Sequence, residues 1–174
     1  DDMNNYILNN DTATATADIT PRSLTILGVA ANDKIYDRTT TATIDASSAT
    51  LSGVLSGDTV TVDIAGATGA FEDENAGIGK TVNITGLALG GADMNNYSLT
   101  GTGATTTATI TPRDITSISG ITAGNKIYDG TDTATLNTGS ATFSGLISGD
   151  TLTVATSTGT FIDENAGTNK TVNI

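Results

Sequence analysis

The sequence contains no cysteine and no histidine. The absence of cysteine excludes disulfide bonds and a thiol nucleophile, and the absence of both residues excludes a Cys/His zinc site. Acid–base catalysis by histidine is also excluded. No serine lies in the sequence setting of a nucleophile elbow. We therefore expect that the protein is not an enzyme and that it needs no cofactor.

Basic residues and long apolar runs are also scarce. The sequence has seven Lys and Arg residues and 19 Asp and Glu residues, which gives a net charge of −12. Nucleic acids and anionic membranes bind clusters of basic side chains, so we expect neither partner. No apolar run is long enough to cross a bilayer, so we expect no membrane insertion. No signal peptide is present, and an export signal would have to lie outside this sequence.

Large side chains are few, with three Phe, four Tyr and no Trp. The apolar residues are mostly Ala, Val, Ile and Leu, and Thr is abundant beside 20 Gly. Thr and Val suit a half-buried pleated surface, and Gly supplies turns. This composition predicts an all-β chain of moderate stability, because small side chains bury less apolar area.

The sequence is repetitive. Asp2-Met3-Asn4-Asn5-Tyr6 recurs 91 residues later as Asp93-Met94-Asn95-Asn96-Tyr97. Four further segments recur at offsets between 90 and 92: Lys34–Asp37 as Lys126–Asp129, Leu51–Asp58 as Phe143–Asp150, Asp73–Gly77 as Asp163–Gly167, and Lys80–Ile84 as Lys170–Ile174. A period near 91 exceeds that of common solenoids and suits a sandwich domain of the immunoglobulin type.

Alternation of apolar and polar residues predicts the strands. The clearest is Thr59–Ile64, with Val60, Val62 and Ile64 inward. The other predicted strands are Ser23–Leu27, Thr39–Asp45, Ala49–Leu51, Ala70–Phe71, Lys80–Leu87 with Val82 and Ile84 inward, Tyr97–Thr100 and Thr105–Thr111. The last two are expected to form an antiparallel hairpin. The predicted fold class is all-β, with tandem immunoglobulin-like antiparallel β-sandwich repeats of about 91 residues.

Pro21 and Pro112 mark the predicted domain junctions, since proline suits a strand end or edge. We predict that residues 1–20 are the C-terminal hairpin of a preceding repeat. Residues 21–111 would form a complete sandwich, and residues 112–174 a second repeat without its last hairpin. Sequence with strand character runs almost without a break across Pro112, which predicts a semi-rigid joint and not a flexible Gly/Ser linker.

Together these motifs resemble the bacterial YDG domain. They are Lys126-Ile127-Tyr128-Asp129-Gly130, Ser148-Gly149-Asp150, the turn Asp163–Gly167 and the closing Thr-Ile-Thr-Pro-Arg. Related modules, called MBG repeats, occur in tandem in very large exported proteins, including filamentous-haemagglutinin-like adhesins. The resemblance implies an immunoglobulin-like fold, a surface or extracellular location and a structural or adhesive role. It implies no particular ligand. Arg38 replaces the glycine of the signature, and so a positive φ is not required there.

Acidic side chains recur in one turn of each repeat. Asp73, Glu74, Asp163 and Glu164 are candidate calcium ligands, because calcium prefers several converging oxygens. The alternative is that Asp and Asn cap a turn that ends at Gly77, with the carboxylates in water.

Four lysines also recur. Lys34, Lys80, Lys126 and Lys170 could form a Lys–Asn crosslink, as some immunoglobulin-like adhesin domains do, with Asn83 or Asn96 as acceptor. The alternative is an exposed lysine paired with an acid such as Asp37 or Asp73. Tyr36 and Tyr128 could contact a partner, or could pack on a sandwich edge with the hydroxyl bonded to backbone. Tyr6 and Tyr97 are expected to pack in the same way.

The expected function is mechanical: a stalk or fibre repeat of a giant exported bacterial surface protein. Its partners would be neighbouring repeats or copies of itself, joined head to tail by strand complementation. The alternative is a multivalent module that binds a host or matrix glycan or protein. The outward positions of the predicted strands are mostly Thr, and no group of aromatic side chains is present on which a ligand could stack. This favours the stalk over the binding module. Paired carboxylates could in principle hydrolyse glycosides, but a catalytic pair needs no copy in every repeat.

Overall fold

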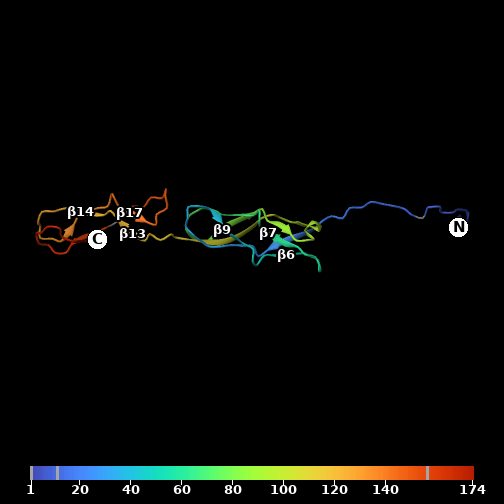
Figure 1. Ribbon diagram of the computed structural model, residues 1–174, viewed down its shortest axis with the longest axis horizontal. Helices are drawn as coiled ribbons and strands as arrows, with labels where there is room; N and C mark the ends of the chain where they lie inside the picture. Colours follow the sequence, from blue (N-terminus) through green and yellow to red (C-terminus); the bar gives the residue numbers. More distant parts are fainter. Residues whose placement is uncertain (1, 11, 156) are drawn as a thin grey trace. The chain divides into compact units, whose positions relative to one another are not determined.

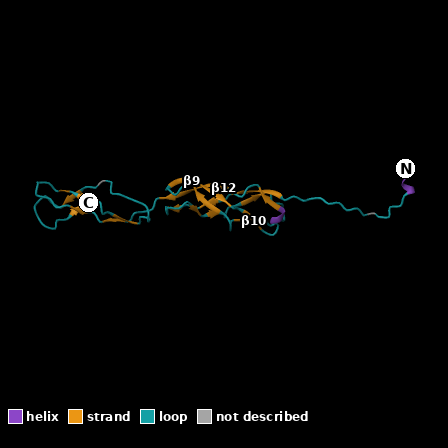
Figure 2. Ribbon diagram, turned by 90° about the horizontal axis from the view of Figure 1, so that it is seen from above, coloured by secondary structure: helices purple, strands orange, loops and turns teal. Residues whose placement is uncertain are grey.

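A computed structural model describes residues 2–10, 12–155 and 157–174. Within these ranges the regular structure is β-strand, apart from two short 3-10 helices, η1 (Asp2–Asn5) and η2 (Met94–Asn96), drawn purple in Figure 2. The predicted all-β class is confirmed. Across the described ranges, no helix has both the length and the apolar character needed to cross a membrane.

The chain divides into two compact units. The first holds the chain up to Asn32 with Thr43–Ala70 and Val82–Thr106, and the second holds Asp33–Ala42, Phe71–Thr81 and Thr107–Ile174. The largest sheet has five strands in the order β3-β12-β9-β8-β4. Their bounds are β3 Lys34–Ile35, β4 Thr41–Ala42, β8 Thr68–Phe71, β9 Gly77–Thr85 and β12 Ala104–Thr111.

Three smaller sheets belong to the first unit. In one, β1 (Arg22–Leu27) lies between β11 (Tyr97–Leu99) and β6 (Thr50–Ser52). The others pair β7 (Thr61–Asp63) with β10 (Ala88–Gly90), and β2 (Ala30–Ala31) with β5 (Ile44–Asp45). The pairing of β1 with β11 is parallel, as is that of β3 with β12. The expectation of purely antiparallel sheets is therefore wrong.

The predicted hairpin of Tyr97–Thr100 with Thr105–Thr111 is also wrong, because β11 and β12 lie in different sheets. The connection between them is bonded to other segments. The Thr100 N–H donates to the Leu24 carbonyl oxygen at 3.0 Å, and the Thr102 carbonyl oxygen accepts the Leu87 N–H at 2.9 Å. These bonds carry the chain from one sheet to the other instead of folding it back.

The strand pairings recur in the second half of the chain. β13 (Ser117–Ser119) pairs with β17 (Thr142–Ser144), as β1 pairs with β6. β14 (Thr122–Ala123) pairs with β16 (Leu136–Asn137), as β2 pairs with β5. The sheet β15-β18-β19, formed by Thr133–Ala134, Gly159–Phe161 and Val172–Asn173, repeats the order β4-β8-β9. The sequence repeat is thus also a repeat of strand pairing.

The most deeply buried side chains are aliphatic. Leu24, Val82, Ile84, Leu87 and Ile110 are at most 1% exposed, which confirms the predicted inward orientation of Val82 and Ile84. Val60 and Val62 are only half-buried, and Ile64 is 36% exposed and lies beyond the end of β7. Its predicted inward position is wrong because Asp63 Oδ1 accepts the Ala65 N–H at 2.9 Å, and this turn ends the strand.

Residues 2–20 contain η1 and, at the described positions, no strand (Figure 1). Tyr6 is 80% exposed and Ile19 is fully exposed. The expectation that Tyr6 packs like Tyr97 is therefore wrong. That this segment closes a preceding repeat stays a prediction, as do the other domain boundaries.

Candidate functional site

Lys34 is the centre of a polar turn built by the Lys-Ile-Tyr-Asp motif. Its Nζ lies 2.7 Å from Asp37 Oδ1 and donates to the Thr39 carbonyl oxygen, to Thr39 Oγ1 and to the Thr41 carbonyl oxygen at 2.8, 2.9 and 3.1 Å. Asp37 Oδ1 also accepts the Thr39 N–H at 2.9 Å. The ring of Phe71 lies 5.7 Å from Nζ. The aspartate therefore caps the turn, and the lysine fills its centre.

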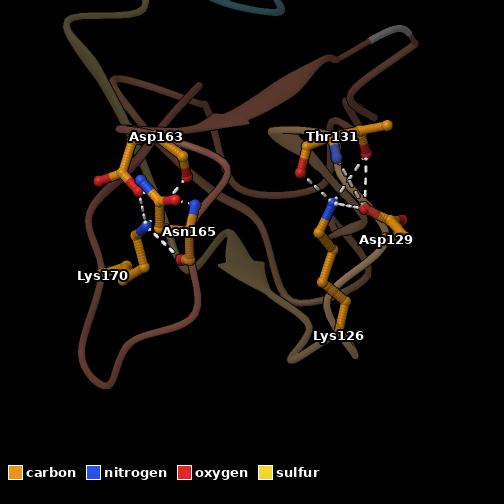
Figure 3. A network of polar contacts seen from close by, with 6 residues as sticks. All are labelled: Lys126, Asp129, Thr131, Asp163, Asn165 and Lys170. Atoms are coloured by element: carbon orange, nitrogen blue, oxygen red, sulfur yellow. Dashed lines mark hydrogen bonds and ion pairs between the residues drawn. The ribbon is translucent and has the colours of Figure 1, made fainter.

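Lys126 repeats this arrangement in the second copy of the motif (Figure 3). Its Nζ donates to Asp129 Oδ1 at 2.8 Å, and to the carbonyl oxygen and Oγ1 of Thr131 at 2.6 and 2.9 Å. The ring of Phe161 lies 5.8 Å away. Both lysines thus have matching partners in sequence and space, which indicates a structural role that each repeat needs.

The ammonium groups perturb the two aspartates. The hydrogen bond from Lys34 is the main cause that lowers the pKa of Asp37 from 3.8 to about 2. The hydrogen bond from Lys126 does the same to the pKa of Asp129, again to about 2. Bonds from Thr39 and Thr131 act in the same direction. Both carboxylates therefore keep their charge far into acid.

The acidic turn holds a second lysine in each repeat. Lys80 Nζ lies 2.7 Å from Asp73 Oδ2, and its side chain is only 9% exposed. Asp73 Oδ1 accepts the Asn75 N–H at 2.7 Å. The predicted pairing of Lys80 with Asp73 is confirmed, but the expectation of an exposed lysine is wrong here. The aliphatic stem is covered while the ammonium group reaches a carboxylate.

Lys170 occupies the equivalent place in the second turn (Figure 3). It contacts the Asp163 carboxylate and donates to the carbonyl oxygens of Asp163 and Asn165 at 3.0 and 2.6 Å. Hydrogen bonds from Lys80 and Lys170 are the main causes that lower the pKa values of Asp73 and Asp163.

The candidate calcium ligands lie around these lysines. Asp73 and Asp163 face an ammonium group, and Glu74 and Glu164 are exposed. Among the described residues, no three acidic side chains gather as a metal site would require. Calcium binding stays a prediction. The Lys–Asn crosslink also stays a prediction, and an intact mass equal to that of the unmodified sequence would exclude it.

Arg38 is a residue that sequence reasoning misjudged. Its φ is 67°, close to the 72° of Gly130 at the same place in the second repeat. The turn therefore keeps a positive φ, and the expectation that arginine relaxes this requirement is wrong. Arg38 Nη1 donates to the Ser148 carbonyl oxygen at 2.8 Å, and its Nε lies 3.2 Å from Asp150 Oδ1. These contacts offset the strain of a left-handed arginine.

The tyrosines differ between the copies. Tyr36 helps to line a cavity of about 500 Å³ with Pro112, Ile147 and Leu152. Burial, followed by a hydrogen bond to Asp150, raises the pKa of Tyr36. Tyr128, its counterpart, is 63% exposed. The predicted bond from a tyrosine hydroxyl to backbone occurs at neither residue in the described structure, but it does occur at Tyr97, which accepts the Leu55 N–H.

Comparison with known families gives one result. The family model of the YDG domain matches residues 20–108 and again residues 111–174. No curated protein sequence gives a significant match, and no solved structure does.

Proposed function

This chain belongs to the YDG domain family, and we propose that it is a structural stalk or fibre module of a giant exported bacterial surface protein. The parent protein would be an adhesin of the filamentous-haemagglutinin type, with the module outside the cell. The module's task is to hold a distal domain away from the surface. Each repeat is proposed to be an immunoglobulin-like sandwich.

The observation that carries this proposal is the junction at Pro112. Before it, the Thr111 carbonyl oxygen accepts the Tyr36 N–H at 2.9 Å. After it, Arg113 Nε donates to the Gly145 carbonyl oxygen at 2.9 Å, and the Thr116 N–H donates to the Ser144 carbonyl oxygen at 2.9 Å. Backbone hydrogen bonds thus hold Thr111 and Thr116, and only the four residues 112–115 lie between these two anchored positions. A stalk requires such a joint.

The surface supports the same function. The outward positions of β12 include Thr105, Thr107 and Thr111, which are exposed. A net charge of −12 keeps a long array soluble and discourages lateral association. The proposal includes no enzymatic activity, because the sequence has neither His nor Cys.

The proposal also includes head-to-tail joining of copies by strand complementation. Support comes from residues 12–20, which have the sequence character of β12, a strand that lies between β3 and β9 in its sheet. A segment of this character can add to the edge of a sheet in another chain.

A glycan and matrix-protein array tests the stalk against the alternative of a multivalent binding module. The chain is displayed on beads at high density, and beads carrying an unrelated acidic protein are the control. A stalk module gives no specific, saturable binding. Saturable binding that free chain competes away would favour the adhesive module.

A further inference from the structure

The two parallel strand pairings of the first repeat join its beginning to its end. β1, its first strand, pairs with β11 from Arg22 with Tyr97 to Leu24 with Leu99. β12, its last strand, pairs at its carboxy-terminal end with β3. In each pairing one strand lies near the entry of the chain into the repeat and the other lies near its exit. Each pairing lies within one of the two compact units.

The parallel direction decides how tension acts on these strands. In a parallel pair the amino-terminal ends lie side by side, as Arg22 and Tyr97 do here. Tension along the chain pulls β1 toward its amino-terminal end and β11 toward its carboxy-terminal end. The pair is therefore loaded in shear, and all of its hydrogen bonds resist together. If the two strands were antiparallel, the same tension would open the pair from one end, one bond at a time.

Further bonds extend the first pairing beyond the end of β11. The Thr100 N–H and the Thr100 hydroxyl both donate to the Leu24 carbonyl oxygen, at 3.0 and 3.2 Å. The side chain of Leu24 is completely buried. If β1 slides past β11, both bonds break and an apolar side chain leaves the core, which costs free energy.

The first residue pair of β1 and β11 is also bonded to one turn. Arg22 Nε donates to the Gly53 carbonyl oxygen at 2.8 Å. The Tyr97 hydroxyl donates to Asp58 Oδ2 and accepts the Leu55 N–H at 3.1 Å. Because both strands are bonded to the same turn, neither can slide without breaking these contacts. The arginine bond has a counterpart in the second repeat.

The pairing of β3 with β12 has the same character. Ile110 lies opposite Lys34 and is 1% exposed. The Tyr36 N–H donates to the Thr111 carbonyl oxygen at 2.9 Å, and Thr111 Oγ1 donates to the Lys34 carbonyl oxygen at 3.3 Å. The strand by which the chain leaves the repeat is thus fixed to a strand near its entry.

On the basis of the proposed function as a stalk, we infer that this repeat bears tension, and that the pairings β1–β11 and β3–β12 form a shear clamp that resists its extension. The load enters through β1 and leaves through β12. Resistance to force is governed by the rate of unfolding and not by the equilibrium free energy. A repeat with small side chains and moderate stability can therefore still be mechanically strong.

Optical-tweezers pulling of the full chain in two directions tests this inference. Since the sequence has no cysteine, handles attach only at introduced ones. Thr20→Cys with Asp114→Cys pulls along the chain and loads the clamp in shear. Thr20→Cys with Asn95→Cys pulls the adjacent amino-terminal ends of β1 and β11 apart and unzips the same pair. All three positions are exposed.

Two proline variants, made with the first pair of handles, locate the resistance. Thr100→Pro removes the N–H and the hydroxyl that bond Leu24. Thr102→Pro is the matched control two residues away, because the bonded group of Thr102 is its carbonyl oxygen, which proline keeps. Circular dichroism shows whether each variant is folded.

We expect the shear direction to need a several-fold higher unfolding force than the unzipping direction. Thr100→Pro should lower the force in shear, and Thr102→Pro should leave it close to that of the unchanged strands. Equal forces in the two directions would overturn the inference, as would equal losses in the two proline variants. If Thr100→Pro does not fold, the comparison of the two directions decides alone.

These outcomes are independent of the tests of the stalk itself. Binding by the bead-displayed chain and the stiffness of the joint at Pro112 do not depend on the strength of the clamp. A weak clamp would therefore leave the stalk proposal standing, and a failure of the stalk proposal would be seen in those other measurements.

Discussion

The Tyr97 hydroxyl bridges the Asp58 carboxylate and the backbone N–H of Leu55, and thereby ties β11 to a turn 39 residues earlier. Both hydrogen bonds are part-buried. We expect Tyr97→Phe to lower the Tm by roughly 4–8 °C, because both bonds are lost while the ring stays in place. Differential scanning calorimetry measures this. Tyr128→Phe, at an exposed tyrosine, is the control and should leave the Tm unchanged.

The same contact predicts a dependence of stability on alkaline pH. The hydrogen bond to Asp58 is the main cause that raises the pKa of Tyr97 above 10.0. Its stabilising contribution is therefore complete below pH 10 and is lost as the pH rises through the raised value. Urea unfolding between pH 8 and 11 should show this loss in the unchanged chain and a smaller one in Tyr97→Phe. If the free energy of unfolding depends equally on pH in both proteins, the loss does not come from the Tyr97 hydroxyl.

Acid should destabilise the protein by protonating the aspartates of the lysine-centred turns. The pKa values of Asp37 and Asp129 fall from 3.8 to about 2 on folding, so their contribution is complete above pH 3.8 and is lost as the pH falls through about 2. We expect the double variant Asp37→Asn/Asp129→Asn to lose less stability than the unchanged chain between pH 4 and 2. Circular dichroism during acid titration measures it. Asp33→Asn combined with Asp132→Asn is the control for charge.

Two substitutions of Arg38 separate the energetic cost of its backbone strain from the stabilisation that its side-chain contacts provide. Arg38→Gly removes both the strain of φ 67° and the bonds to Ser148 and Asp150. Arg38→Ala loses the bonds but keeps the strain. We expect Arg38→Ala to be less stable than Arg38→Gly by about 1 kcal/mol. Gly130→Ala, where no neighbour lies within 4 Å of the new Cβ, reports the strain alone and should cost a similar amount. Equal stability of the two Arg38 variants would show that the turn is not strained.

We expect two neighbouring strands, β12 and β3, to contribute unequally to the stability of the core. Ile110→Ala in β12 should lower the free energy of unfolding by about 2–5 kcal/mol, because a side chain that is 1% exposed leaves a cavity. Ile35→Ala in the adjacent β3 removes a side chain that is 60% exposed and should change it by about 0.5 kcal/mol or less. Guanidinium titration of both variants measures the difference. If both variants lose a comparable free energy of unfolding, Ile110 is not part of the stabilising core.

Calcium has a direct test at Asp73, Glu74, Asp163 and Glu164. Because lysines already neutralise the two aspartates, we expect melting curves in calcium and in chelator to coincide. A rise of several degrees in Tm with calcium, absent in Glu74→Gln/Glu164→Gln, would establish the metal site that the sequence suggested.

Much of the fold was readable from local patterns. Val82 and Ile84 were predicted to face the core from simple alternation, and the recurring Lys34 and Lys126 led to the correct ion pair with Asp37 in the first copy. These features depend on residues close together in sequence. A repeat within one chain also shows which residues a module needs, without other sequences to compare.

Long-range pairing could not be read in the same way. Nothing in the alternation of Tyr97–Leu99 distinguishes a hairpin partner from a parallel partner 75 residues away, since β11 bonds β1 through backbone atoms. Arg38 was misjudged for a different reason. The same turn of the second repeat has Gly130 with a φ of 72°, so the turn itself requires a positive φ, and the arginine of the first copy conceals this requirement in the sequence.

The central claim is that the joint at Pro112 is semi-rigid, and a distance distribution across it is the most direct test. Since the sequence has no cysteine, Ile78→Cys and Ile162→Cys can be spin-labelled selectively at side chains that are 92% and 67% exposed. Ile35→Cys with Ile78→Cys is the control pair within one repeat. Double electron–electron resonance should give a distribution across the joint about as narrow as the control. A broad distribution, typical of a flexible Gly/Ser linker, would contradict the account.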